Sequence, residues 1–420
     1  MKILWVKSGG FLPRDTGGKI RSYSLLRELA RRHDVSVFTF YPRHKDDQHG
    51  DLRSFCRDVV LLPLDLPTRA SLPDMLAYAR NIARPVPYSM VKYGRPEVGV
   101  RLCELLASQS YDAIICDFLL TAAVVPWELP CPKVLFTHNI EAVIWERHWR
   151  VSRNPLFKLI SWREYRTMAH IERLYLQKAD HVLTVSDSDR DYFSKIIAPE
   201  KITTIPTGVD IDYFTPASTG SGQPDTLVFT GSMDWLPNED AILYFAEKIL
   251  PSVQARVPGV KLRVVGRKPS PRVQALASGN SCIEVTGTVP DIRPHLESAC
   301  VYVVPLRIGG GTRIKIFEAM AMGKAVVSTS IGAEGLPVTH GENILLADRP
   351  EDFAETVVRL LTHTTERGRI GAAARRLVET QYSWSAVTDV LDSTLMEVIA
   401  NHRCGGQESH LCGAATSTSL

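Results

Sequence analysis

Two kinds of segment alternate along the first half of the chain: short apolar runs rich in β-branched residues, and longer stretches with apolar positions at helical spacing. The apolar runs cover residues 3–7, 35–40, 59–64, 113–116, 134–137 and 182–185. Several runs are apolar throughout, which is typical of strands buried on both faces of a parallel sheet. Strands that alternate with helices predict βαβ units, so we expect a doubly wound, Rossmann-like α/β domain over residues 1–205.

The pattern breaks at residues 206–225, where Gly, Pro, Ser and Thr dominate, and this composition indicates an interdomain linker. A second alternating set has apolar runs at 227–230, 262–265, 283–285, 301–304, 325–328 and 344–346, and helical stretches near 238–256, 312–322 and 351–378. We therefore predict a second Rossmann-like domain over residues 226–400 and a disordered tail over 401–420. Two such domains facing across a cleft would form a two-substrate site at the carboxyl ends of their strands.

Composition narrows the class of protein. The 420 residues are 45% hydrophobic and 23% charged, which excludes a disordered or fibrous chain. The formal net charge of +3 does not favour a dedicated nucleic-acid binder. No apolar stretch approaches the length of a membrane span, and the first residues predict a strand rather than a signal peptide. The eight cysteines are scattered, so we expect reduced, buried thiols and a cytoplasmic protein.

The strongest chemical pattern follows the apolar run at 301–304. It contains Gly309, Gly310, Gly311, Thr312, Arg313, Lys315 and Glu318. Glycines at a helix start let backbone N–H groups approach an anion, and the helix dipole adds partial positive charge. Because that dipole disfavours cations in the first turn, Arg313 and Lys315 are better explained by a bound diphosphate. Glu318 shares a helix face with Lys315 and would suit sugar hydroxyls. The alternative is an exposed Lys/Glu pair behind a glycine turn.

This segment resembles the donor-binding motif of the retaining GT-B glycosyltransferases of the family 4 type, which ends in Glu-Ala-Met-Ala-x-Gly. The resemblance extends in order over nearly 380 residues and includes Gly17 and Gly18 after the first strand, His138 after the strand at 134–137, Gly231, Gly266 and Val289. Within the family, the chain is similar to sugar transferases of exopolysaccharide clusters.

The resemblance implies a hexosyltransferase (EC 2.4) that moves a sugar from a nucleotide sugar to a saccharide or lipid-linked acceptor with retention, in surface or extracellular polysaccharide biosynthesis. It implies no bound metal and no other cofactor. The expected catalytic residues are His138, Lys315, Glu318 and Arg313. The expected donor-binding residues are Gly17, Gly18, Gly231, Gly266, Arg267, Val289, Gly309, Gly310, Gly311 and Thr312. An epimerase-like enzyme and a non-catalytic nucleotide-sugar binder are the alternatives.

Two positions depart from the family pattern. Gly310 stands where the family commonly has a second glutamate, so backbone N–H groups of the glycine run are expected to take over its role. The loop at 231–240 lacks the usual Arg and Lys, so Arg313, Lys315 or Arg267 is expected to supply the charge.

His138 follows a buried strand, where loops present functional groups. The alternative is a capping or core histidine. Glu141 is expected to orient its ring or to contact the acceptor. Gly17-Gly18-Lys19 lacks the spacing of a P-loop.

Three groups of Asp, His or Cys residues resemble metal sites, but we interpret them as parts of a helix start, a linker and a tail. Asp187 with Asp189 stands at a helix start, and Asp210 with Asp212 lies in the predicted linker. His402, Cys404, His410 and Cys412 fall in the predicted tail with no usual zinc spacing.

Residues 146–178 carry eight Lys or Arg against three Glu, interleaved with aromatic residues. A basic, aromatic-rich helix is suited to a peripheral contact with an anionic membrane surface. The other interpretation is a solvated helix that covers the first sheet.

Overall fold

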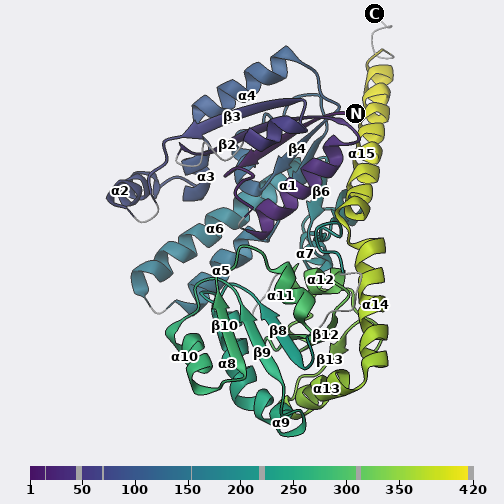
Figure 1. Cartoon of the computed structure of the whole chain (residues 1–420). Helices are drawn as coiled ribbons and strands as arrows, with labels where there is room; N and C mark the ends of the chain where they lie inside the picture. The colour runs from purple at the N-terminus through teal and green to yellow at the C-terminus, as the bar shows by residue number, and fades with distance from the viewer. Residues whose placement is uncertain are drawn as a thin grey trace, which may run out of the picture. The chain divides into compact units, whose positions relative to one another are not determined.

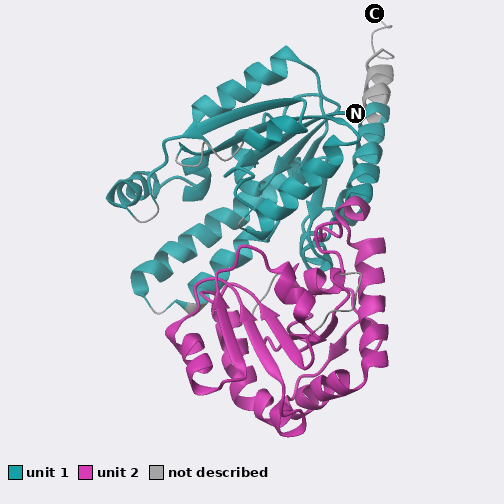
Figure 2. Cartoon of the chain, viewed as in Figure 1, with its two compact units in different colours: residues 1–206, 388–420 teal, residues 207–387 magenta. Residues whose placement is uncertain are grey.

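Parallel strands form the core of both halves of the chain. The structure, a computed structural model, describes residues 1–14, 16–43, 50–68, 71–152, 154–216, 223–308 and 314–414, with only the backbone described for Val151 and for 405–414. The chain divides into unit 1, residues 1–206 with 388–420, and unit 2, residues 207–387 (Figure 2).

Unit 1 contains a seven-stranded sheet in the order β3-β2-β1-β4-β5-β6-β7, with all neighbours parallel (Figure 1). Its strands are β1 (Lys2–Ser8), β2 (Asp34–Pro42), β3 (Asp58–Leu64), β4 (Ala113–Asp117), β5 (Lys133–Phe136), β6 (His181–Thr184) and β7 (Ile202–Thr204). Its helices are α1 (Gly17–Ala30), α2 (Leu72–Asn81), α3 (Tyr88–Tyr93), α4 (Pro96–Ser108), α5 (Glu141–Val151), α6 (Pro155–Lys178) and α7 (Asp187–Phe193), with short 3₁₀ turns at Gly50–Ser54, Leu119–Ala123 and Pro199–Lys201.

Unit 2 contains a six-stranded parallel sheet in the order β10-β9-β8-β11-β12-β13. Its strands are β8 (Thr226–Thr230), β9 (Lys261–Val265), β10 (Ile283–Gly287), β11 (Val301–Val304), β12 (Ala325–Ser328) and β13 (Leu345–Leu346). Its helices are α8 (Leu236–Tyr244), a π segment (Phe245–Ile249), α9 (Leu250–Arg256), α10 (Pro271–Gly279), α11 (Arg293–Ser298), α12 (Ile314–Ala321), α13 (Pro350–Thr362) and α14 (Thr364–Gln381).

Every apolar run that predicted a strand coincides with a strand of one of the two sheets. The sequence missed β7, which has only three residues. It also merged α8 with α9. Pro251 explains the interruption, because its missing N–H breaks the regular ladder just after the π segment at Phe245–Ile249. The stretch at 351–378 is likewise two helices, separated at His363.

The prediction of a disordered tail is wrong for the backbone that is described. Helix α15 (Trp384–Ala414) continues through residue 414, and no proline interrupts it. It packs on unit 1 through ion pairs of Arg32 with Asp389 (2.5 Å) and of Arg403 with Asp112 (2.7 Å). The side chains of His410 and Cys412 lie outside the described part.

One arginine ties the start of unit 2 to its helices. Arg375 of α14 donates to the carbonyl groups of Ile211 (3.3 Å), Phe214 (2.7 Å) and Ala321 (2.5 Å). The residues before and after the linker gap therefore belong to one packed unit, of which 217–222 are outside the described residues.

We expect Arg375→Ala to lower the free energy of unfolding by about 1–3 kcal/mol, because it leaves these carbonyl groups without their donor. Its exposed neighbour Arg376 is the matched control, and Arg376→Ala should change stability by less than about 0.5 kcal/mol. Urea unfolding of the two variants measures the difference. Equal losses would contradict this role of Arg375.

Candidate active site

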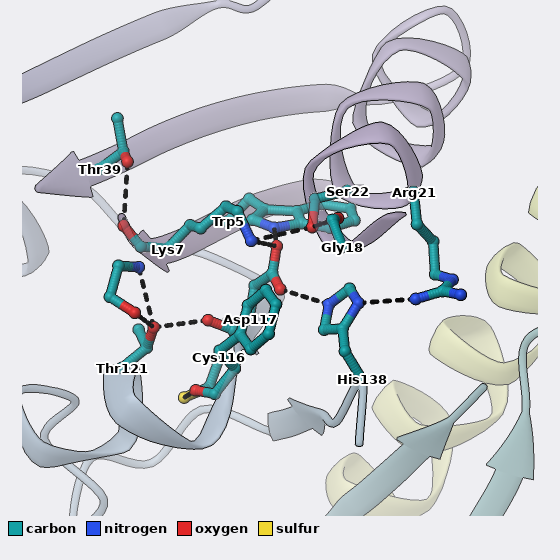
Figure 3. Close-up of polar contacts among 12 residues, drawn as sticks. Trp5, Lys7, Gly18, Arg21, Ser22, Thr39, Cys116, Asp117, Thr121 and His138 are labelled. Atoms are coloured by element: carbon teal, nitrogen blue, oxygen red, sulfur yellow. Dashed lines mark hydrogen bonds and ion pairs between the residues drawn. The ribbon is translucent and has the colours of Figure 1, made fainter. Parts of the chain in front are cut away.

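A buried carboxylate stands at the carboxyl end of β4 in unit 1. Asp117 is fully buried, and its Oδ2 lies 3.1 Å from Lys7 Nζ and 2.9 Å from Trp5 Nε1, both on β1 (Figure 3). Lys7 also donates to Ser22 Oγ on α1 at 3.0 Å. The parallel pairing of β1 with β4 brings these groups to one edge of the sheet.

His138 follows β5 and is held from both sides. Its Nε2 lies 2.7 Å from Asp117 Oδ1, and its Nδ1 lies 2.9 Å from a guanidinium nitrogen of Arg21 (Figure 3). A guanidinium can only donate, so Nδ1 accepts and Nε2 carries the proton that is donated to Asp117. Burial lowers the pKa of His138 from 6.5 to about 4, although Asp117 opposes this shift. The imidazole is therefore neutral at pH 7 in one tautomer.

The charges of this group constrain one another. Burial lowers the pKa of the Lys7 ammonium, while Asp117 raises it. Burial likewise favours the neutral form of Asp117, but Lys7 and then His138 outweigh it and hold the pKa of Asp117 well below its usual range. Burial also lowers the pKa of Arg21 to about 10, which leaves it charged at neutral pH. Asp117 thus compensates Lys7, and Asp117 and Asp189 together favour the charged form of Arg21, as buried charges require.

Aromatic packing fixes the plane of the His138 ring. Phe118 stacks on it with ring centroids 4.0 Å apart and an interplanar angle of 12°. Phe118 adopts a φ of 72°, which is uncommon for a bulky residue and marks a constrained backbone. At Gly18, a Cβ would lie 2.7 Å from the Phe118 ring, so glycine is required there by this packing. Gly17 forms the first residue of α1.

A second set of polar contacts lies in unit 2, around Lys315 on α12. Its Nζ lies 2.7 Å from Asn238 Oδ1 and 4.2 Å from the centre of the Phe229 ring. Asn238 is buried and its Nδ2 donates to the carbonyl of Ser232 at 2.8 Å. Arg267 Nε donates to Ser232 Oγ at 2.8 Å. Two cations from elsewhere thus reach the 231–240 loop, which has no Arg or Lys of its own.

Two glycines make room for this arrangement. A Cβ at Gly231 would lie 2.6 Å from Asn238 Nδ2 and 2.9 Å from Lys315 Nζ. A Cβ at Gly266 would lie 1.7 Å from the carbonyl oxygen of Gly231. Close backbone approach between the ends of β8 and β9 therefore requires glycine at 266.

Glu318 lies one turn after Lys315 on α12 and is partly buried. Burial raises its pKa from 4.5 to about 7, and Lys315 opposes the shift. The carboxyl group therefore changes charge near neutral pH. Val289 packs against the core of unit 2. The expected site residues Gly309, Gly310, Gly311, Thr312 and Arg313 lie outside the described residues.

Sequence reasoning missed Lys7, Arg21, Asp117 and Asn238. A signal existed for two of them, because Lys7 and Asp117 are charged residues at the ends of otherwise apolar strands. The expectation that Glu141 orients the His138 ring is wrong, since Asp117 and Arg21 engage both ring nitrogens. Glu141 instead begins α5, where its backbone N–H donates to Glu172 at 2.8 Å.

The acidic pairs have local partners. Asp187 accepts from Thr204 Oγ1 at 2.8 Å, and Asp210 accepts from the backbone N–H of Tyr213 at 2.9 Å. Among the described side chains, no group of three or more His, Cys, Asp or Glu is arranged to hold a metal ion.

The fold matches solved structures over nearly the whole chain. Sucrose-phosphate synthase from Thermosynechococcus elongatus gives a TM-score of 0.67 at 18% identity, over 95% of this chain and 99% of its own. HepE from Anabaena, solved with UDP, gives 0.64 at 15% identity, over 94% and 100%. WaaG, a glycosyltransferase involved in lipopolysaccharide biosynthesis, gives 0.58 at 17% identity, over 93% and 99%. The likeness establishes a GT-B fold.

Two protein families match successive parts of the sequence. Residues 16–213 match Glycosyltransferase Family 4, and residues 224–363 match Glycosyl transferases group 1. The chain carries the two domains of a GT-B glycosyltransferase of the family 4 type. Lys315 and Glu318 lie in its group 1 domain, and Asp117 and His138 in its family 4 domain.

Curated relatives of this glycosyltransferase are distant. An uncharacterized 44.6 kDa protein in the cps region of Klebsiella pneumoniae is 21% identical over 392 residues, which are 91% of this chain and 96% of that protein. The phosphatidyl-myo-inositol mannosyltransferase of Mycobacterium tuberculosis is 30% identical over 217 residues, 49% of this chain and 56% of the mannosyltransferase. The match thus spans about half the length of that enzyme.

The pKa of His138 predicts a dependence of stability on pH. The unfolded chain binds more protons than the folded chain between the folded value of about 4 and the ordinary value of 6.5. The contribution of His138 to the free energy of unfolding is therefore complete above pH 6.5 and is lost as the pH falls toward 4, by roughly 3 kcal/mol. The pKa of Asp117 is depressed from 3.8, so its own contribution is lost only below this window.

Urea unfolding at a series of pH values measures this slope. We expect His138→Gln to remove the contribution of His138 to this slope, while His170→Gln on the exposed surface of α6 should leave the slope as in wild type. If the free energy of unfolding had the same slope with pH in wild type and in His138→Gln, His138 would not be a neutral imidazole with both ring nitrogens hydrogen-bonded.

Proposed function

We propose that this glycosyltransferase moves a sugar from a nucleotide diphosphate sugar to a saccharide or lipid-linked saccharide, with retention, in surface or extracellular polysaccharide biosynthesis. The observation that carries the proposal is that Lys315 and Arg267 contact residues 231–240, which follow the carboxyl end of β8 beside β9. A diphosphate needs fixed cations near its oxygens, and ligands of parallel sheets bind at this edge. HepE, with a similar fold, was solved with UDP-glucose.

Lys315 would stabilise the leaving nucleoside diphosphate. Charge develops on that group as the bond to the sugar breaks, and a cation fixed beforehand stabilises it without reorganisation. Asn238 fixes the position of Lys315 through a hydrogen bond of 2.7 Å from Lys315 Nζ to Asn238 Oδ1. Arg313 and the amides at 309–311 would add further donors. Glu318, as a carboxylate, would accept hydrogen bonds from the ribose hydroxyls of the donor.

His138 would contact the transferred sugar as an acceptor. Its Nδ1 is unprotonated, so this atom can only accept a hydrogen bond, for example from a sugar hydroxyl. Arg21 would release Nδ1 when the sugar binds. A neutral imidazole whose proton is donated to Asp117 is poorly suited to act as a general acid, which fits a mechanism in which the protein supplies charge and orientation.

Protein cations would take the place of a metal at the diphosphate, so we propose a metal-independent enzyme without a further cofactor. None of the helices in the described part of the chain is long and apolar enough to cross a bilayer. We propose a cytoplasmic enzyme that meets a lipid-linked acceptor at the inner face of the membrane, through residues 146–178.

A thermal-shift panel tests the donor. Ligands that bind the native state raise its melting temperature. The purified full chain is heated with UDP, GDP, ADP, CMP, NAD and the common sugar conjugates. Stabilisation by one nucleoside diphosphate and its sugars supports the proposal and names the base. Stabilisation by NAD alone would favour an oxidoreductase, and donor turnover without an acceptor product would favour an epimerase.

Lys315→Ala combined with Glu318→Ala should abolish transfer and remove the thermal shift by the donor. The matched control is Lys248→Ala with Glu247→Ala, an exposed ion pair of the same unit with its charged atoms 2.9 Å apart. Product formation is followed by chromatography with the donor that the panel identifies. Full activity in the first double variant would remove this site assignment, and loss in both would indicate a general defect.

The raised pKa of Glu318 predicts a pH-dependent affinity for the donor. Because only the carboxylate accepts two ribose hydroxyls, affinity should rise as the pH passes the folded pKa of about 7. Over one unit on either side of it, the ionised fraction changes by about tenfold. Calorimetry with the intact nucleotide sugar avoids titration of a terminal phosphate. Glu318→Gln should lack the step, and a step of the same size in that variant would assign it to another group.

A further inference from the structure

Helix α2 of unit 1 is turned with its apolar side outward. Leu72, Met75 and Leu76 lie at helical spacing and are 69%, 60% and 49% exposed, and Ile82 just beyond the helix is 54% exposed. Asp74 on the opposite side is buried. An amphipathic helix of a globular protein normally presents the reverse arrangement.

The inward polar side of α2 is well satisfied. Asp74 Oδ1 accepts from Tyr88 Oη at 2.8 Å and from Lys92 Nζ at 2.9 Å, and the Ser71 side chain caps the helix. A buried ion pair with additional hydrogen bonds is costly to break. The orientation of α2, and with it the exposure of its apolar stripe, is therefore fixed by these contacts.

The first turns of α6 repeat the same arrangement. Leu156, Phe157, Leu159 and Trp162 are exposed by 66%, 40%, 61% and 41%. Glu164 is buried, and its Oε2 accepts from the backbone N–H of Tyr88 at 3.0 Å. Tyr88 thus donates its hydroxyl to Asp74 of α2 and its backbone N–H to Glu164 of α6. Both helices turn their polar sides toward this residue.

Arg163 joins the two helices. It donates to the carbonyl groups of Ile82 (3.2 Å), Arg84 (2.6 Å) and Val86 (3.1 Å). The third turn of α6 is therefore linked to the segment that follows α2, and α2 and the first turns of α6 both lie on the same side of unit 1 in Figure 1. We call the exposed side chains of residues 71–86 and 154–167 the α2–α6 surface. It holds eight of the eighteen large apolar side chains that are exposed among the described residues.

The exposed charges of the α2–α6 surface are all positive. They are Arg80, Arg84, Lys158 and Arg166. The two acids of these segments, Asp74 and Glu164, are buried and already bonded. Apolar side chains with a tryptophan, bordered by arginine and lysine, match the interface of a bilayer that contains anionic lipid. Exposed apolar side chains that gather in this way indicate an interaction site.

We propose that the α2–α6 surface binds the face of a membrane containing anionic lipids. Leu72, Met75, Leu76 and Leu159 enter the acyl boundary, and the four cations contact phosphate head groups. The proposal relies on the proposed function only for the lipid-linked nature of the acceptor. It adds α2 to the basic segment 146–178 and limits that segment to the start of α6.

Vesicle flotation of the full chain tests the proposal. Wild type is mixed with phosphatidylcholine vesicles with and without phosphatidylglycerol. We expect binding to the anionic vesicles that weakens with salt. Leu72→Ser/Met75→Ser/Leu76→Ser should reduce partitioning by about tenfold or more. The matched control is Val100→Ser/Val390→Ser/Met396→Ser, which changes three other exposed helix positions of unit 1 and should float as wild type does.

Variants with reversed charge distinguish electrostatic attraction to anionic lipid from insertion of the apolar side chains. Arg80→Glu/Arg84→Glu should lose the preference for anionic vesicles, by roughly tenfold. Arg272→Glu/Arg376→Glu, at exposed positions of unit 2, is its control. Absence of wild-type flotation, or equal effects of a variant and its control, would overturn the proposal. A third result would also overturn it: wild type forms a dimer, Leu72→Ser/Met75→Ser/Leu76→Ser is a monomer, and neither protein binds vesicles. The surface would then bind a second copy of the chain.

The donor thermal shift is measured on the same variants. It should be unchanged in all four, since none alters Lys315, Glu318 or His138. Flotation without any nucleotide shift would contradict the proposed function alone, and a nucleotide shift without flotation would contradict the membrane surface alone.

Discussion

The buried carboxylate of Asp117 organises the carboxyl edge of the first sheet. It binds Lys7 and Trp5 from β1 and His138 from the end of β5, and through His138 it reaches Arg21 on α1. A charge at this depth is tolerable only when it is paired and fully hydrogen-bonded. The tautomer of His138, the stacking of Phe118 on its ring and the need for glycine at 18 all follow from that arrangement.

In unit 2, the polar groups at the edge of the sheet are positioned by two glycines, whose lack of a side chain leaves space for them, and not by a pair of buried charges. Gly266 lets the backbone at the end of β9 approach Gly231, and Gly231 in turn leaves space for Asn238 and Lys315. Lys315 then lies over the Phe229 ring and donates to the amide oxygen of Asn238. Residues 231–240 contain no Arg or Lys, but Lys315 of α12 and Arg267, which follows Gly266, both contact them.

The sequence predicted both sheets because buried parallel strands leave apolar runs that stand out from their surroundings. It placed Lys315, Glu318, Gly231 and Gly266 in one domain through the order of the motif. It could not show that Asp117 holds His138, because the two residues lie 21 positions apart and meet only when β4 pairs with β5. Apolar periodicity also could not reveal the break before Pro251, where one missing N–H decides the outcome.

The orientation of α2 shows a different limit of pattern reading. Periodicity identifies an apolar side of a helix but does not state whether the fold buries it. Here the choice is made by Asp74, which accepts from Tyr88 and Lys92 of α3, and by Glu164 of α6, which accepts from the first residue of the same helix. A ten-residue helix is marginal by itself, so its exposed stripe is maintained by these polar contacts and not by burial of the stripe. The free energy that is not gained by burying Leu72, Met75 and Leu76 within the protein remains available for binding at that surface.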